Sequence, residues 1–358
     1  KLTAVVLVGV ITLWVTSSNW LGMGGPAMIG LVALAVVLLA LWWIASAGGA
    51  SPQEQVLVER VQSAQKFLTA WRVAHGTASQ ADVDPWGCGL IGVEWSHTTT
   101  TLGRLEAKRT ACNPAWAAQF LRWYREAGLQ AGDRVAVYSS ASFPGLLLSA
   151  WLAAEAAGLE PLVVVSLGAS TWGANHPQLP WPVIEAALEQ NGYLGGQADF
   201  YSLGGGGEAG GGLSPEAVAG LRAAARSRGV PLLEADSLAG MVEAKSGLLR
   251  SNDVRLLVTI GGPHSSLGDD PEALRFPPGL VFPEQARNAG NGVVAAALEA
   301  GLPVLHLLNI EGLARRVGIP FDAAPGSGLP PRVHPAWALV GLALFLGVLF
   351  THRRWRLV

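Results

Sequence analysis

A run of small hydroxyl side chains, Ser139-Ser-Ala-Ser142, stands in front of Pro144 and has the composition of a catalytic or anion-binding loop. Ser140 and Ser142 are candidate nucleophiles. The general bases and orienting acids considered for them are His97, His176 and His264, with Asp269 or Glu311. No Gly-x-Ser-x-Gly elbow is present. Because a hydroxyl loop before a helix more often caps the helix or cradles an anion, we favour a binding role.

Further donors occur in three other segments. Thr98-Thr-Thr-Thr101, followed by Lys108 and Arg109, has the chemistry of a carboxylate or phosphate clamp, although such a run also makes an ordinary strand. Hydroxyls and amides fill residues 168–177, and glycines fill residues 204–212. The candidate ligand-binding residues are Thr99, Thr100, Lys108, Arg109, Ser139, Ser140, Ser142, Ser170, Thr171, Trp172, Asn175, Gly205 and Gly206.

Gly205, Gly207 and Gly210 match a Gly-x-Gly-x-x-Gly dinucleotide pattern, with Glu234 as the ribose-binding acid. The following helix is expected to begin only at Ser214, and no Gly-Lys-[Ser/Thr] phosphate loop occurs. We therefore interpret the glycines as a flexible ligand loop and expect no cofactor. The histidines have no close-spaced pair, so no metal site is expected.

The elements that must position these loops alternate between strand and helix. Expected strands are 134–138, 161–166, 199–203, 230–234, 254–260 and 304–308, and expected helices are 144–157, 183–190, 214–228 and 283–300. This alternation predicts an α/β fold with a doubly wound, mostly parallel, Rossmann-like sheet over residues 133–325. Residues 51–132 form a helical and irregular lead-in, with a Ser51-to-Glu54 capping box and a second helix from Asn113. Ligands of such sheets bind beyond the carboxyl ends of the strands.

Only 14% of the residues are charged, against roughly 25% in ordinary soluble domains. Residues 2–21 and 26–47 predict two transmembrane helices within residues 1–50, and residues 335–351 predict a third within 333–358. The basic tail, Arg353, Arg354 and Arg356, favours a cytoplasmic C-terminus and an extracytoplasmic domain over residues 51–332, with the opposite topology as the alternative. We therefore expect a multi-pass protein of the cell membrane.

The expected extracytoplasmic domain is acidic. It has 20 basic and 26 acidic residues, a net charge of −6, which argues against a nucleic-acid partner. Its two cysteines, Cys88 and Cys112, would close a disulfide worth about 3 kcal/mol in an oxidising compartment. Two unrelated buried thiols are the alternative.

Ordered motifs between about residues 51 and 325 resemble one known family. They are Gly89-Leu-Ile-Gly-Val-Glu94, Thr98-Thr-Thr-Thr-Leu-Gly103, Glu106-Ala-Lys-Arg-Thr110 with Asn113-Pro114, Ser142-Phe-Pro144, Gly168-Ala-Ser-Thr-Trp-Gly-Ala-Asn175, Ser202-Leu-Gly-Gly-Gly-Gly207 and Gly212-Leu-Ser-Pro-Glu216. With these motifs the chain resembles the poly-gamma-glutamate system protein family. The resemblance implies a membrane protein that acts in synthesis, export or retention of that capsule-type polymer, and it supplies no catalytic residue.

Three functions follow as hypotheses. The first is an accessory or binding component that holds a γ-glutamyl chain, or a partner from the synthase and export machinery, in a cleft between residues 98–109, 139–144 and 168–176. The second is a hydrolase or transferase that acts on γ-glutamyl amide bonds through Ser140 or Ser142. The third is a structural membrane partner whose helices pack against a larger complex.

Overall fold

A six-stranded sheet organises the computed structural model, which describes residues 50–285 and 289–326. Its strands, in spatial order, are β7 (Phe200–Ser202), β3 (Glu160–Ser166), β2 (Arg134–Ser140), β8 (Val254–Ile260), β10 (Val304–Leu307) and β9 (Gly279–Val281). The first five are parallel, and β9 runs antiparallel to β10. Counted along the chain, the parallel strands have the order 3-2-1-4-5, whose direction of winding reverses between β2 and β8. The α/β prediction with a mostly parallel sheet is therefore confirmed.

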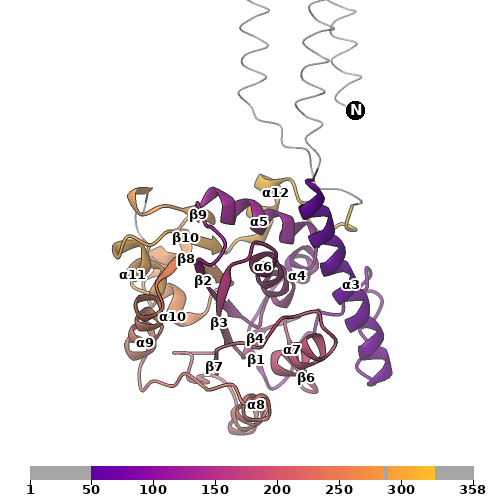
Figure 1. Ribbon diagram of the computed structural model, residues 1–358. Helices are drawn as coiled ribbons and strands as arrows, with labels where there is room; N and C mark the ends of the chain where they lie inside the picture. The colour runs from indigo at the N-terminus through magenta and orange to yellow at the C-terminus, as the bar shows by residue number, and fades with distance from the viewer. Residues whose placement is uncertain (1–49, 286–288, 327–358) are drawn as a thin grey trace, which may run out of the picture. The chain divides into compact units, whose positions relative to one another are not determined.

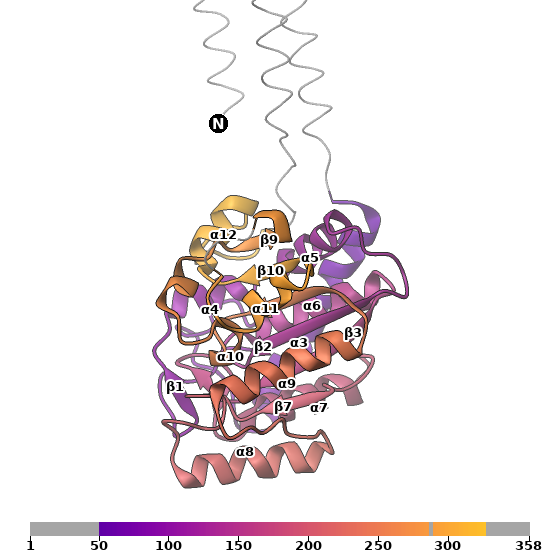
Figure 2. The ribbon, with the colours of Figure 1, turned by 90° about the vertical axis from the view of Figure 1, so that its left-hand side faces the viewer.

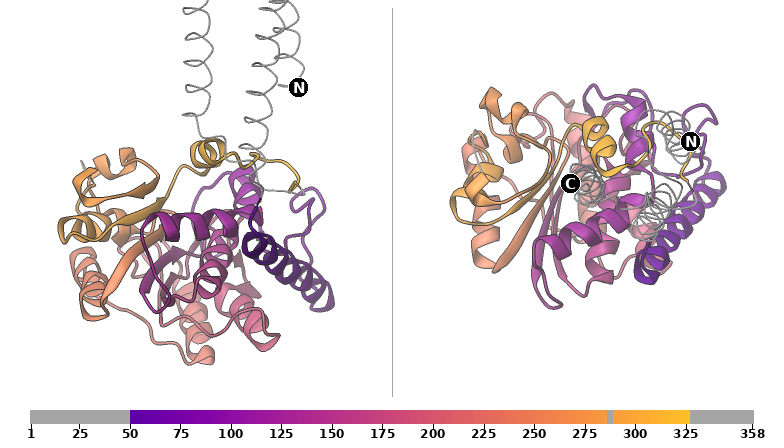
Figure 3. Two further views of the ribbon diagram at one scale, coloured as in Figure 1. Left: turned by 45° about the horizontal axis from the view of Figure 1, so that its top comes forward. Right: turned by 90° about the horizontal axis from the view of Figure 1, so that it is seen from above.

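The strands are nearly continuous apolar runs because both faces of the sheet are covered. Val135 and Val137 enter one core, whereas Ala136 and Tyr138 enter the other. The first core contains α3 (Pro52–Ala74), α4 (Leu105–Ala111), α5 (Ala115–Glu126), α6 (Pro144–Ala156), α7 (Trp181–Gln190), α8 (Pro215–Arg228) and α12 (Ile310–Val317). The second contains α9 (Leu238–Ser251) and α11 (Val293–Glu299) (Figures 1 and 2). Seen from above, orange segments lie on the left of the strands and the indigo and violet helices on the right (Figure 3).

Short elements complete the described part of the chain. They are β1 (Thr99–Thr101), β4 (Ala169–Ser170), β5 (Asn175–His176), β6 (Leu179–Pro180), α10 (His264–Leu267) and the 3-10 turns η1 (Pro271–Arg275) and η2 (Pro283–Gln285). β1 pairs in parallel with β4, which brings the threonine run beside the loop that follows β3. The threonine run is thus a strand, as the alternative interpretation held.

The start of α3 confirms the expected capping box. Ser51 Oγ accepts the Glu54 N–H at 3.2 Å, and Glu54 Oε2 accepts the Ser51 N–H at 2.9 Å. Glu54 also binds Arg122 of α5 at 2.9 Å. Both α3 and α5 also pack against α6, so the lead-in belongs to the same compact unit as the sheet.

Two expected elements were wrong. Residues 230–234 form no strand and meet the sheet only through a bridge between Tyr201 and Leu232. The expected helix at 283–300 is instead η2 and α11. Gly290, at φ +78°, and Gly292 approach the backbone near Leu267 more closely than a side chain would permit. α9, β9 and α12 are additional elements that the apolar pattern did not reveal.

The three expected membrane spans lie outside the described residues. Within residues 50–285 and 289–326, no helix is long and apolar enough to cross a bilayer.

Candidate functional site

A cleft of about 820 Å³ opens beyond the carboxyl ends of β2, β3 and β8. Its lining comes from residues 100–108, 140–143, 166–170, 204–208, 262–274 and Leu308. Two of these segments follow β2 and β8, the strands between which the winding reverses. Doubly wound sheets bind their ligands at this place. The position of the cleft therefore agrees with the site expected from the polar loops.

Lys108 of α4 is the central cation of this cleft and is 3% exposed. Its Nζ donates to the Ser142 carbonyl at 2.5 Å and to Ser170 Oγ at 2.6 Å, and it lies 3.8 Å from the centroid of the Phe143 ring. Burial lowers the pKa of Lys108 to about 7. No carboxylate among the described residues forms an ion pair with it. Lys108 is thus a buried amine whose pKa lies close to neutral pH.

Gly103 permits this arrangement. A Cβ at Gly103 would lie 3.2 Å from Lys108 Cε and 3.0 Å from Ser170 Oγ. A side chain at residue 103 would therefore crowd both the lysine and Ser170. Thr171 Oγ1 holds the turn before α4 by accepting the Gly103 N–H at 2.7 Å and donating to its carbonyl at 2.8 Å.

The serines after β2 line the cleft but are engaged by backbone groups. Ser140 Oγ accepts the Ser142 N–H at 3.0 Å, and Ser142 Oγ accepts the Ser170 N–H at 2.9 Å. Neither hydroxyl has a histidine or acid within hydrogen-bond distance among the described residues. His176 does not line the cleft; it lies on β5, where its Nδ1 accepts the Gln178 N–H. Ser140 and Ser142, the expected nucleophiles, thus have no histidine placed to act as their base.

Glu208 fixes the glycine-rich loop to the strands beneath it. Its Oε2 accepts Ser166 Oγ at 2.8 Å, Ser202 Oγ at 2.6 Å and Lys245 Nζ at 2.5 Å. Its Oε1 accepts the N–H of Ser265 at 3.1 Å and also the hydroxyl of that residue. Burial alone would raise the pKa of Glu208, but Lys245 and the hydroxyls outweigh it and lower the pKa to about 2. The loop is therefore anchored by a buried carboxylate, which corrects the interpretation of a freely flexible loop.

This loop is also badly placed for a dinucleotide. In the 3-2-1-4-5 order the phosphate-binding glycines follow the first strand, which here is β2. The glycine-rich loop, residues 204–212, instead follows β7 at the edge of the sheet. Its Gly207 donates its N–H to His264 Nδ1 at 2.9 Å. Glu234, the expected ribose ligand, pairs with Arg222 at 2.5 Å.

The cleft unites about half of the predicted ligand-binding residues: Thr100, Lys108, Ser140, Ser142, Ser170, Gly205 and Gly206. The others do not line it: Thr99, Arg109, Ser139, Thr171, Trp172 and Asn175. The Asn175 side-chain amide donates to Thr99 Oγ1 at 2.9 Å and thereby joins β5 to β1. Arg109 binds the Val83 carbonyl at 3.0 Å and Asp322 at 3.4 Å. Arg109 is therefore occupied by groups that do not line the cleft.

Several lining residues were missed or had another expected role. Phe143 and Leu274 contribute apolar surface, and Glu208 and His264 lie beside the glycines. His264 and Asp269, considered only as partners of a catalytic serine, line the cleft, whereas His97 and Glu311 do not. Glu208 was missed, although it is the single acid within the glycine-rich residues 204–212 and could have been identified from that position.

Cys88 and Cys112 are both buried and both free thiols in the structure. Burial raises the pKa of Cys88, and the hydrogen-bonding neighbour Cys112 raises it further. The two thiols are thus neighbours, which the alternative of unrelated cysteines did not anticipate. The disulfide stays a prediction. Among residues 50–285 and 289–326, no group of three His, Cys, Asp or Glu side chains could hold a metal ion.

Comparisons with known proteins return no matching family model, no similar curated protein and no similar solved structure.

Proposed function

We propose that this protein is a membrane-anchored binding component of a poly-γ-glutamate synthesis or export system, and that its cleft holds a segment of γ-glutamyl chain. The observation that carries the proposal is Lys108, a buried amine on a roomy cleft without a carboxylate partner among the described residues. A ligand carboxylate would supply the missing charge, and charge-assisted hydrogen bonds are the stronger ones.

The segments that carry the family resemblance support the same proposal. Residues 98–103, 142–144, 168–175 and 202–207 each contribute side chains or backbone to the cleft lining. Thr100, Ser142 and Ser170 line the same cleft as the amine, and the glycines leave backbone surface open to a ligand. Such a lining suits a chain of carboxylates and amides.

Titration of the full chain with γ-glutamyl oligomers at low salt tests the proposal. Lys108→Met removes the charge and keeps most of the side-chain length, and we expect at least about a tenfold loss of affinity. Lys66→Met, at an exposed lysine of α3, is the matched control and should bind like the unmodified protein. Absence of binding by the unmodified protein, or an equal loss in both variants, would refute the proposal.

A second function is favoured by one distance. Ser170 Oγ lies 2.6 Å from Lys108 Nζ, as in a serine nucleophile with a lysine base. With Lys108 neutral, Ser170 Oγ would attack a γ-glutamyl amide carbonyl while its proton passed to Nζ. The leaving amine would then take that proton, and water would hydrolyse the ester. This relocates the expected nucleophile from Ser140 or Ser142 to Ser170.

The two functions separate in the Ser170→Ala variant. Hydrolysis requires Ser170, so chain shortening would disappear and no acyl adduct would form on the protein. Carboxylate binding requires the lysine charge, so affinity would change by less than about threefold. Chain shortening that persists in Ser170→Ala would exclude the hydrolase mechanism.

A further inference from the structure

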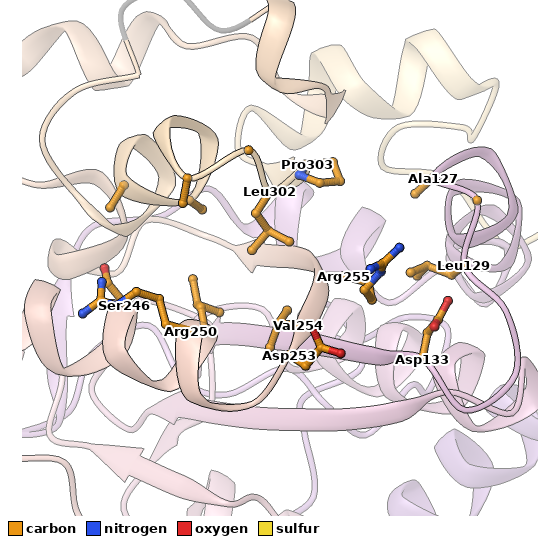
Figure 4. A pocket seen from close by; sticks show the side chains of 16 residues that line it. Ala127, Leu129, Asp133, Ser246, Arg250, Asp253, Val254, Arg255, Leu302 and Pro303 are labelled. Atoms are coloured by element: carbon orange, nitrogen blue, oxygen red, sulfur yellow. The ribbon is translucent and has the colours of Figure 1, made fainter.

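A second cavity, of about 480 Å³, lies at the opposite edge of the sheet, at the amino ends of β2, β8 and β10. Its walls come from the turn after α5, the ends of α9 and α11, and the first residues of these strands. Leu302 and Pro303 face Asp253 and Val254 across it, with Ser246 at one end and Asp133 at the other (Figure 4). No expected site residue lies here.

Ser246 lines this cavity with a hydroxyl that lacks a hydrogen-bond partner among the described residues. It is 4% exposed, and its Oγ has no hydrogen-bond partner in the described part of the chain. A buried polar group without a partner is costly, and native proteins rarely keep one without a reason. A ligand that carries a hydrogen-bonding group to this end of the cavity would satisfy it.

The mouth of the cavity presents both signs of charge. Arg255 and Asp253 are exposed and form no ion pair with described residues, whereas Arg250 is held by Glu243 at 2.5 Å. Asp133 lies beside them, with one carboxylate oxygen on the Gln130 N–H. The C-terminal ends of α5 and α9 add negative potential, which favours a cation near the two acids.

Small and apolar residues separate the two polar ends. Ala296, Ala297 and Gly301 leave width on the α11 side, and Leu249 and Leu302 supply apolar contact. This combination matches a ligand with a zwitterionic head, an apolar stem and a polar tip.

We propose that the cavity at the amino edge binds a free α-amino acid whose side chain ends in a hydrogen-bonding group. Arg255 takes the α-carboxylate, Asp133 and Asp253 take the α-ammonium, Leu249 and Leu302 contact the stem, and Ser246 binds the tip. The site is separate from the carboxyl-edge cleft, and the proposal does not depend on the function of that cleft.

Calorimetric titration of the full chain with L-glutamine and L-tyrosine tests the proposal. Their partners without the polar tip, L-methionine and L-phenylalanine, should bind about three- to tenfold more weakly, since one hydrogen bond is lost. N-acetyl and amide derivatives, which lack one head charge, should bind at least about tenfold more weakly. No binding of any of the four amino acids at millimolar concentration would overturn the proposal.

Variants locate the site without disturbing the fold. Arg255→Gln should weaken glutamine binding at least about tenfold, and the control Arg250→Gln less than about twofold, because Arg250 is already paired. Ser246→Ala should abolish the preference for glutamine over methionine. Ser266→Ala changes a buried hydroxyl that also has no partner among the described residues but lies outside the cavity, and it should keep that preference. Equal effects of the two arginine variants, or of the two serine variants, would refute the assignment.

Discussion

At the carboxyl edge of the sheet, Glu208 collects hydrogen bonds from three serines and an ion pair from Lys245, all within the protein. At the amino edge, Ser246 has no partner and Arg255 has no ion pair among the described residues. Glu208 thus anchors its loop through internal polar bonds, whereas Ser246 and Arg255 at the amino edge have no such partners among the described residues. The carboxyl edge combines this internal anchoring with Lys108, an amine that is bonded to Ser142 and Ser170 but has no carboxylate partner among the described residues.

The largest expected effect tests the rigid edge. Glu208→Gln leaves Lys245 buried without its counter-charge, which should lower the free energy of unfolding by about 3 to 5 kcal/mol. At the amino edge, Asp253→Asn should stay within about 0.5 kcal/mol, because Asp253 is exposed and Asn tolerates its positive φ. Denaturant unfolding followed by tryptophan fluorescence measures both.

The double variant Glu208→Gln with Lys245→Met sharpens this result. Removal of both charges leaves no isolated ion, so part of the lost stability should return relative to Glu208→Gln alone. A Glu208→Gln variant as stable as Asp253→Asn would show that the two edges do not differ in the way described.

The next effect is the pH dependence of binding at the two edges. The pKa of Lys108 is lowered to about 7, so the empty cleft loses its cation as the pH rises above that value. If the charged lysine holds a carboxylate, affinity should fall up to about tenfold per pH unit above pH 7. Hydrolysis that uses neutral Lys108 as the base would have the opposite pH dependence: its rate would increase as the pH rises through 7.

Amino-acid binding at the amino edge supplies the control. Arginine side chains are not deprotonated in proteins, so affinity there should be constant between about pH 6 and pH 7.5. If the affinity for the γ-glutamyl chain is equally constant over this pH range, charged Lys108 is not the group that binds its carboxylate.

The sequence revealed the carboxyl edge because its signals are local. The strands are apolar runs with a Gly, Ser or Asn within two residues of each strand's end. Parallel order brings those ends together. The hydroxyl runs therefore led to Lys108, Ser142 and Ser170. The neighbouring residues Lys108 and Arg109 show the limit: they point about 100° apart on α4, and only the packing of that helix decides which one faces the cleft.

Long-range pairs were beyond such reasoning. Glu208 and Lys245 are 37 residues apart, and α9, which carries the lysine, was not expected as a helix. Ser246 follows Lys245 directly, yet its cavity exists only because α9 and α11 end near the same strands. A sequence contains no local sign that a hydroxyl lacks a partner.

The smallest expected effect compares one serine at each edge. Ser265 donates to the Glu208 carboxylate, so Ser265→Ala should cost about 1.5 to 3 kcal/mol of stability. Ser246→Ala removes a hydroxyl without a partner and should be neutral, or stabilising by up to about 1 kcal/mol, in the empty protein. With glutamine at one hundred times its Kd, the unmodified protein should gain about 2.7 kcal/mol and the Ser246→Ala variant less at the same concentration. Thus the Ser246→Ala effect should shift toward destabilisation by about 0.6 to 1.3 kcal/mol when the ligand is added, whereas the Ser265→Ala effect should not shift. Loss of stability in the empty Ser246→Ala variant would mean that the hydroxyl already has a partner and that the amino edge is as complete as the carboxyl edge.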